Sequence, residues 1–269
     1  MNCILTLVSS DNKKPLLEKH LKAVERCLSI KNTESRWLSP DKAADLHLMD
    51  KPVGPARIQL ESLLAEDRID FFVIANIHKR KKRLLVADMD NTMIEGETLD
   101  ELAAQCGLKV QIAQITELAM RGEIDFKTAL QNRVEMLKDL SERALQKTLA
   151  AIRPMPGAEL LISTMRRHGA KCVLVSGGFT CFTKPIAAKL GFHANHGNTL
   201  EIRDGRLTGR VYDPILDHQA KLSFLQHYQA ASGLDSTDIL AIGDGANDLA
   251  MIQAAGLGVG YHPKPYLKE

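Results

Sequence analysis

The sequence predicts an α/β protein in which a parallel-sheet core carries an inserted helical cap and follows a small α+β module. Three features support this fold class. Short, wholly apolar runs recur beyond residue 83, helical periodicity fills a long stretch between the first two runs, and the N-terminal residues form a separate compositional unit. At 269 residues, the chain is long enough for two modest domains. We expect the N-terminal module to span residues 1–78 and the core residues 79–269, with the cap inserted at about 95–153.

The N-terminal module combines two expected strands with two expected helices. Strands are predicted at Asn2–Val8 and at Asp70–Ile77, where Phe, Val and Ile are frequent. Apolar residues at helical spacing predict helices within Pro15–Leu28 and Pro55–Ala65. The segment Asn32–Gly54 is ambiguous, and its prolines favour loops. A small α+β module fits this pattern.

Three short apolar runs predict the strands of the core. None of them alternates with polar residues, which is typical of parallel strands buried on both faces, as in a Rossmann-like sheet. The runs are Leu84–Ala87, Cys172–Val175 and Ile239–Ile242. Each run ends in polar or glycine-rich sequence, and the carboxyl ends of parallel strands lie at one edge of a sheet. The sequence therefore predicts one functional site assembled from three strand ends.

The long insertion after the first of these strands predicts four short amphipathic helices, which form a cap over the site. Their apolar stripes lie at Leu99–Cys106, Ile112–Ala119, Ala129–Leu137 and Ala144–Ile152. Ser141 is a suitable N-cap for the last helix. We expect the cap to join the core at two crossings only, near Ile94 and Pro154–Gly157. Further along, Thr199–Val211 alternates around Asp204 and Gly205, which predicts a β-hairpin.

The overall composition excludes several classes of protein. The net charge of +2 is too small to indicate a nucleic-acid partner by itself, and no apolar stretch has the length of a membrane helix. The five cysteines are scattered without a CxxC pair, so neither a disulfide framework nor a zinc site is expected. Since the N-terminus lacks a signal-peptide pattern, we expect a cytoplasmic protein with no membrane partner. The basic run His78–Arg83 leaves nucleic-acid binding open as an alternative, although a solvated linker fits a run without aromatic residues better.

The segment Asp88–Thr92 carries the most chemical information. Its two carboxylates, Asp88 and Asp90, are spaced i, i+2 and can project from the end of a buried strand into one pocket. One carboxylate can bind a cation and attack phosphorus, while the other transfers a proton to and from the leaving oxygen. For this motif taken alone, a polar turn in which the aspartates accept backbone N–H groups is the alternative.

The other two strand ends supply groups of the kinds that phosphate and Mg²⁺ need. Ser176–Gly178 offers a hydroxyl and unobstructed backbone N–H groups for phosphate oxygens, or forms a tight turn. Gly243–Asp248 offers hard oxygen ligands of the kind that Mg²⁺ prefers, or forms a surface loop. Lys221 could neutralise charge on a transferring phosphoryl group, although a lone lysine is usually solvated.

In combination, these segments resemble the haloacid dehalogenase-like phosphatase superfamily, and within it the phosphoserine phosphatases. The resemblance runs from about Leu84 to the C-terminus. The segments that carry it are Asp88–Thr92, Glu97–Glu101, Ala119–Phe126, Ser176–Phe179, Ala220–Lys221 and Ala241–Asp248. It implies an Mg²⁺-dependent enzyme that hydrolyses O-phospho-L-serine, the last step of serine biosynthesis. The N-terminal module is similar to the ACT fold, but its loop Ser9–Lys13 lacks the glycine of an amino-acid-sensing site.

The resemblance also implies a role for each residue of the core site. Asp88 would be the nucleophile that forms an aspartyl-phosphate, and Asp90 the general acid and then the base for the attacking water. Mg²⁺ would be bound by Asp88, Asp244 and the backbone carbonyl of Asp90, with Asp248 supporting these ligands. The residues that would hold the phosphoryl group are Thr92, Ser176, Gly177, Gly178, Lys221 and Asn247.

In the cap, the resemblance implies contacts with the amino-acid part of the substrate. Glu97 would pair with the substrate ammonium group and Arg133 with its carboxylate, while Met120 and Phe126 would exclude water. A zwitterionic substrate does need one acid and one bidentate arginine in addition to a phosphate site. Taken singly, these residues could instead be a helix-start acid, an exposed helix charge and part of the cap core. Another small phosphomonoester therefore stays an alternative substrate, and no nucleic-acid partner is expected.

Overall fold

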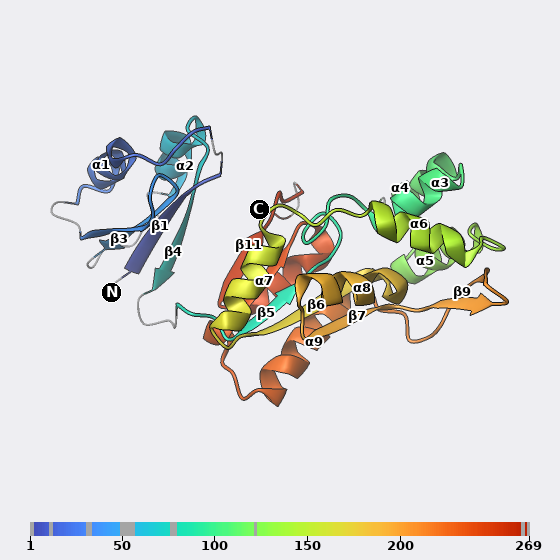
Figure 1. The fold of residues 1–269 in the computed structure, drawn as a ribbon. Helices are drawn as coiled ribbons and strands as arrows, with labels where there is room; N and C mark the ends of the chain where they lie inside the picture. The colour runs from blue at the N-terminus through green and yellow to red at the C-terminus, as the bar shows by residue number, and fades with distance from the viewer. Residues whose placement is uncertain are drawn as a thin grey trace. The chain divides into compact units, whose positions relative to one another are not determined.

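The structure is a computed structural model that describes residues 3–10, 13–30, 34–48, 57–75, 80–120, 123–264 and 267. The chain forms two compact units, Met1–Arg80 and Lys81–Glu269 (Figure 1). Within the described residues, no helix has both the length and the apolarity needed to cross a membrane.

The N-terminal unit is a four-stranded antiparallel sheet with two helices packed on one face. Its elements are β1 Cys3–Ser9, α1 Glu18–Cys27, β2 Ser35–Ser39, β3 Ala43–Leu48, α2 Arg57–Ala65 and β4 Ile69–Ala75. The order along the chain, βαββαβ, is ferredoxin-like. Leu5 and Leu7 of β1 pack with Leu21 and Val24 of α1 because alternate strand residues point to the helix-covered face.

Two strands of this unit lie where the sequence favours loops. β2 and β3 fall within the segment Asn32–Gly54, so the loop prediction is wrong there. β3 pairs with β1 along its length, from Cys3 opposite Leu48 to Val8 opposite Ala43, and Leu48 is buried as a result. The stabilising partner of β3 is distant in sequence, which local patterning does not reveal.

The basic run is not a continuous exposed stretch in its described part, and His78–Lys79 lies outside the described residues. Arg80 donates to both oxygens of the buried Asp45 carboxylate. Lys82 is 5% exposed and donates to the backbone carbonyl of Thr237 at 2.7 Å. These contacts engage two of the basic groups within their own units, so the described part of the run is not a fully solvated linker.

The second unit is built on a five-stranded parallel sheet in the order β11-β10-β5-β6-β7, which confirms the predicted fold class. The strands are β5 Leu84–Ala87, β6 Lys171–Phe179, β7 Ala194–Asn198, β10 Ile239–Gly243 and β11 Leu257–Gly260. The three apolar runs form β5, β6 and β10 at the centre of the sheet. The outer strands β7 and β11 contain polar residues and glycines instead of apolar runs, so the sequence pattern does not predict them.

Helices cover both faces of this sheet. Leu85 and Leu174 point to one face and join the apolar cluster that includes α7 and α8 residues. Val86 and Val173 point to the other face and join the cluster that includes α9 and α10 residues. The four helices are α7 Ala158–Arg167, α8 Thr180–Leu190, α9 His218–Ala231 and α10 Leu249–Ala254. This burial on both faces explains why the central strands are apolar throughout.

Four helices lie between β5 and α7, and we call residues 98–151 the cap. They are α3 Thr98–Gln105, α4 Lys109–Met120, α5 Phe126–Glu135 and α6 Glu142–Ala151. The side chain of Ser141 caps α6 by accepting a hydrogen bond from the N–H of Arg143 at 3.3 Å, as predicted. Figure 1 shows the cap helices, in green to yellow-green, gathered at one end of the second unit.

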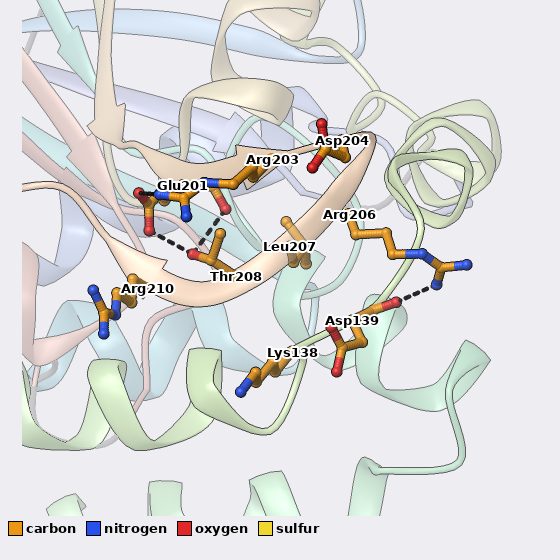
Figure 2. A pocket seen from close by; sticks show the side chains of 9 residues that line it. All are labelled: Lys138, Asp139, Glu201, Arg203, Asp204, Arg206, Leu207, Thr208 and Arg210. Atoms are coloured by element: carbon orange, nitrogen blue, oxygen red, sulfur yellow. Dashed lines mark hydrogen bonds and ion pairs between the residues drawn. The ribbon is translucent and has the colours of Figure 1, made fainter.

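The predicted hairpin forms a third link between the cap and the core. Its strands are β8 Leu200–Arg203 and β9 Arg206–Val211. The N–H of Asp139 donates to Leu207 O at 2.8 Å, and the N–H of Leu207 donates to Leu140 O at 2.9 Å. The Arg206 guanidinium adds a bond to the Asp139 carbonyl at 2.7 Å, beside a shallow, charged hollow of about 390 Å³ (Figure 2). These hydrogen bonds are a non-covalent contact that the sequence does not predict, whereas the two expected chain crossings, Ile94 and Pro154, lie side by side as a β-bridge.

Candidate active site

The ends of β5, β6 and β10 meet at one cavity of about 130 Å³, which core and cap residues enclose together. β5 lies between β10 and β6, and the N–H of Asp88 donates to Ile242 O at 3.0 Å. The core residues that line the cavity are Asp88, Asp90, Ser176, Gly177, Gly178, Phe179, Asp244, Asn247 and Lys264. The residues that line it from the cap side are Glu97, Thr98, Leu99, Phe126, Leu130 and Arg133.

Three carboxylates and one ammonium group form a buried cluster at the core side. One oxygen from each of Asp88, Asp244 and Asp248 lies within 4.8 Å of the others. Lys221 Nζ donates to Oδ1 of Asp88 and to Oδ1 of Asp248, at 2.6 Å each. Burial alone would lower the pKa of Lys221, but the two carboxylates outweigh it and raise that pKa. Burial also raises the pKa of Asp88, against the opposing effect of Lys221.

Asp248 holds the loop after β10 in place. Its Oδ2 accepts from the N–H groups of Asp244 at 3.2 Å and Gly245 at 3.1 Å, while its Oδ1 accepts from Lys221. Gly243 permits this packing, because a Cβ at that position would lie 2.2 Å from Asp248 Cγ. Both oxygens of Asp248 therefore have partners within the protein.

Asp90 contacts the cavity from the turn after β5. Its Oδ1 accepts from the N–H of Thr98 at 2.8 Å, and its Oδ2 accepts from the hydroxyl of Ser176 at 3.4 Å. Burial, reinforced by the negative charge of Glu97, raises the pKa of Asp90 to about 7. A carboxyl group with this pKa exchanges its proton near neutral pH, as a general acid or base must.

The segment Ser176–Gly178 continues β6 instead of forming a turn after the strand. Ser176 Oγ accepts from the N–H of Gly178 at 2.8 Å, and a Cβ at Gly178 would lie 3.3 Å from Asp90 Oδ2. Thr92 does not line the cavity, but it is 2% exposed and its hydroxyl has no partner among the described residues. A buried hydroxyl without a partner is typical of a group that awaits a ligand or water.

Glu97 and Arg133 bring opposite charges to the cap side of the cavity. Glu97 is the residue before α3, and its Oε1 accepts from Asn91 Nδ2 at 2.7 Å. Burial raises the pKa of Glu97. Arg133, in the last turn of α5, donates through Nε to Ala129 O at 3.1 Å, and burial lowers its pKa.

Phe126 gives the cavity an apolar wall. Its ring lies 3.4 Å from the position that a Cβ would take at Gly177, so the start of α5 lies directly against the end of β6. Asn247 lies on the short 3-10 helix Ala246–Asp248 and also lines the cavity. The side chain of Met120 lies outside the described residues.

Asn91 and Lys264 bring polar side chains to the site that the sequence analysis does not assign to it. Asn91 adopts a φ of 53°, a left-handed conformation that asparagine tolerates, and its amide reaches Glu97 from there. Lys264 Nζ lies 3.0 Å from Asp244 Oδ2 and 3.6 Å from Glu97 Oε1. Asn91 falls within the Asp88–Thr92 motif, whereas nothing in the local sequence marks Lys264, because its position depends on the return of the chain to β10.

Comparison with known proteins agrees with this geometry. The family model for haloacid dehalogenase-like hydrolases matches residues 85–253, which include all three strand ends. The chain belongs to this family. The chain is 41% identical over 231 residues to a phosphoserine phosphatase of Streptomyces coelicolor, and the alignment covers 86% of this chain and 56% of that protein. It is 38% identical over 191 residues to a phosphoserine phosphatase of Methanocaldococcus jannaschii, covering 71% of this chain and 90% of that protein.

A solved structure extends the similarity to the N-terminal unit of this chain. The haloacid dehalogenase family hydrolase t0658 of Salmonella enterica serovar Typhi aligns over 99% of this chain and 91% of its own, with a TM-score of 0.88 and 27% identity. By contrast, the chain spans only 56% of the length of the Streptomyces relative. Each of the two units thus has a counterpart in another member of the family.

Proposed function

We propose that this hydrolase removes phosphate from O-phospho-L-serine and releases serine and inorganic phosphate. The observation that carries the proposal is the meeting of two chemically different sets of side chains in one cavity. Asp88 and Asp90 line it from the core side, and Glu97 and Arg133 bring opposite charges from the cap side. Such a cavity suits a phosphomonoester that carries both an ammonium and a carboxylate group. Similarity to two phosphoserine phosphatases supports the same substrate.

Asp88 is the proposed nucleophile. Its carboxylate oxygen forms a bond to phosphorus while the bond between phosphorus and the serine oxygen breaks, which gives an aspartyl-phosphate. Asp90, protonated below its pKa of about 7, gives its proton to the departing serine oxygen. Asp90 then takes a proton from the water that attacks phosphorus, and Asp88 is released together with inorganic phosphate. Lys221, 2.6 Å from Asp88, offsets negative charge in both steps.

The phosphoryl oxygens have several proposed partners around Asp88. Each of them supplies a hydroxyl, an amide or an N–H group near the strand ends. They are Thr92, Ser176, Gly177, Gly178 and Asn247, with Lys221 as the charged member of the set. Phe126 and Met120 are proposed to keep other water molecules away from the aspartyl-phosphate.

The acid cluster fits a magnesium ion. Asp88 and Asp244 offer carboxylate oxygens, and Asp90 its backbone carbonyl, all of which are the hard ligands that Mg²⁺ prefers. The three carboxylates outnumber the two ammonium groups that contact them, those of Lys221 and Lys264, so the cluster has room for the charge of a divalent cation. When bound, Mg²⁺ would withdraw negative charge from the phosphoryl oxygens. Asp248 supports the cluster through its bonds to Lys221 and to the loop after β10.

Phosphate release from a panel of phosphomonoesters, with Mg²⁺ and after chelation, tests this function. We expect O-phosphoserine to react fastest, and chelation to abolish a rate that Mg²⁺ restores. Phosphoethanolamine lacks the carboxylate that Arg133 would bind, and 3-phosphoglycerate replaces the ammonium group that Glu97 would bind with a hydroxyl, so both should react more slowly. Faster hydrolysis of 3-phosphoglycerate, or full turnover in EDTA, would contradict the proposal.

A further inference from the structure

Lys264 contacts one carboxylate on the core side of the cavity and one on the cap side. Its Nζ is 3.0 Å from Asp244 Oδ2 and 3.6 Å from Glu97 Oε1. The backbone holds it there, because the N–H of Tyr261 donates to Gly243 O at 2.8 Å and the N–H of Lys264 donates to Asp244 O at 2.9 Å. The lysine is 51% exposed, so its ammonium group can reach both the carboxylates and solvent. Its placement therefore follows from backbone hydrogen bonds between the segment after β11 and the end of β10.

Each carboxylate that contacts Lys264 has a second proposed partner of positive charge. Glu97 is the proposed ligand of the substrate ammonium group, and Asp244 is a proposed ligand of the divalent cation. Two cations at one carboxylate repel each other over a few ångströms, and the repulsion weakens the binding of both. Lys264 therefore competes with the substrate ammonium group for Glu97 and with the divalent cation for Asp244.

Arg133, the positive charge on the cap side, forms no ion pair within 4.0 Å among the described residues, although the charges of Asp100 and Glu97 lie near enough to act on it. Arg133 donates to the carbonyl of Ala129 at 3.1 Å and to the hydroxyl of Thr116 at 3.5 Å, and both partners are neutral. Its charge is therefore available to a ligand carboxylate, whereas Glu97 already faces an ammonium group. In the free protein, the carboxylate of an amino-acid ligand would therefore meet an arginine without an ion-pair partner, whereas its ammonium group would have to displace Lys264 from Glu97.

We propose that Lys264 is a specificity-determining residue that acts as an exchangeable counter-ion for Glu97 and Asp244. It pairs with both carboxylates in the free protein and yields them to the ammonium group of the ligand and to the divalent cation. After phosphate transfer, Lys264 competes with the ammonium group of serine for Glu97, which favours release of this product. The identity of the amino-acid ligand rests on the proposed function, whereas the competition at Asp244 does not.

Calorimetric titration of the full chain with L-serine, Mn²⁺ and inorganic phosphate tests this inference. In Lys264→Met, we expect the dissociation constants of serine and Mn²⁺ to fall by roughly 4- to 20-fold, the effect of one charge removed from about 5 Å in a half-exposed site. Inorganic phosphate, an anion, should bind no more tightly than to the wild type. Lys264→Arg keeps the charge and should resemble the wild type.

Lys127→Met is the matched control. Lys127 is 54% exposed and forms a comparable ion pair with Asp213 at 3.1 Å, but it does not line the cavity. Its loss should leave all three dissociation constants unchanged. An equal effect of both methionine variants would overturn the proposal, as would unchanged or weaker binding of serine and Mn²⁺ by Lys264→Met. Weaker binding of phosphate alone would make Lys264 a phosphate ligand and also overturn it.

Failure of the proposed function has a separate signature. A wild-type protein that neither hydrolyses O-phosphoserine nor binds serine would contradict that function. The Mn²⁺ titration of Lys264→Met would then still decide the competition at Asp244. Tighter Mn²⁺ binding supports that part of the inference, and unchanged binding overturns it.

Discussion

Replacement of Asp90 by asparagine should stabilise the metal-free protein, and should do so more strongly at alkaline pH. Folding raises the pKa of this carboxyl from 3.8 to about 7. The folded state therefore binds the proton more tightly than the unfolded state. The free energy that this carboxyl subtracts from stability is absent below the unfolded pKa and reaches its full value as the pH rises through the folded pKa. A shift of about 3 units gives a ceiling of about 4 kcal/mol near pH 8, and about 2 kcal/mol near pH 5.5. Asparagine removes this cost and still offers an acceptor to the N–H of Thr98.

Scanning calorimetry in EDTA measures the effect. The gain in Tm of Asp90→Asn over the wild type should be about 4–8 °C larger near pH 8 than near pH 5.5, since 1 kcal/mol corresponds to about 2–4 °C in a unit of this size. Glu159→Gln, which neutralises an exposed carboxylate at the start of α7, is the control and should show no such dependence. A gain that is independent of pH, or a loss of stability near pH 8, would refute the assignment of a raised pKa to Asp90.

Three other perturbations test the acid cluster and the cap. Gly243→Ala should destabilise the protein by about 2–4 kcal/mol, because the new Cβ would overlap Asp248; urea unfolding measures this loss, and a change under about 0.5 kcal/mol would contradict it. Lys221→Met should lower the free energy of unfolding by about 3–5 kcal/mol at neutral pH, because Asp88 and Asp248 lose their partner. The loss should be smaller near pH 5, where an unpaired carboxylate takes up a proton, and equal losses at both pH values would argue against the pairing. A phosphate mimic with Mg²⁺ should protect amides of the cap and of β9 together from hydrogen exchange, since the main chain links them, and protection of the cap alone would show that the link breaks.

Local sequence patterns were sufficient to predict the central strands of the parallel sheet. β5, β6 and β10 are apolar throughout because helices cover both faces of the sheet, and such runs are visible in sequence. The four cap helices and the hairpin follow from periodicity and turn residues, both of which depend on neighbours along the chain. The convergence of three strand ends then follows from the geometry of a parallel sheet.

The remaining features depend on contacts between distant residues. β3 is stable through its pairing with β1, and the glycine-rich β11 through its pairing with β10. The bond from Leu207 to Leu140 links the hairpin to the cap, although no periodicity predicts it. Lys264 reaches Asp244 only because the chain returns to the end of β10. These contacts are tertiary, and local sequence does not specify them.

Trapping of the covalent intermediate tests the central claim most directly. O-phosphoserine labelled in its phosphate is mixed with the enzyme and Mg²⁺ in a rapid-quench instrument, and the labelled peptide is mapped. We predict label on Asp88 in the wild type and none in Asp88→Asn, whereas Asp90→Asn should lose roughly 10²–10⁴-fold in rate without loss of the nucleophile. Label on Asp90 or Ser176 in the wild type, or a phosphoenzyme in Asp88→Asn, would contradict the mechanism.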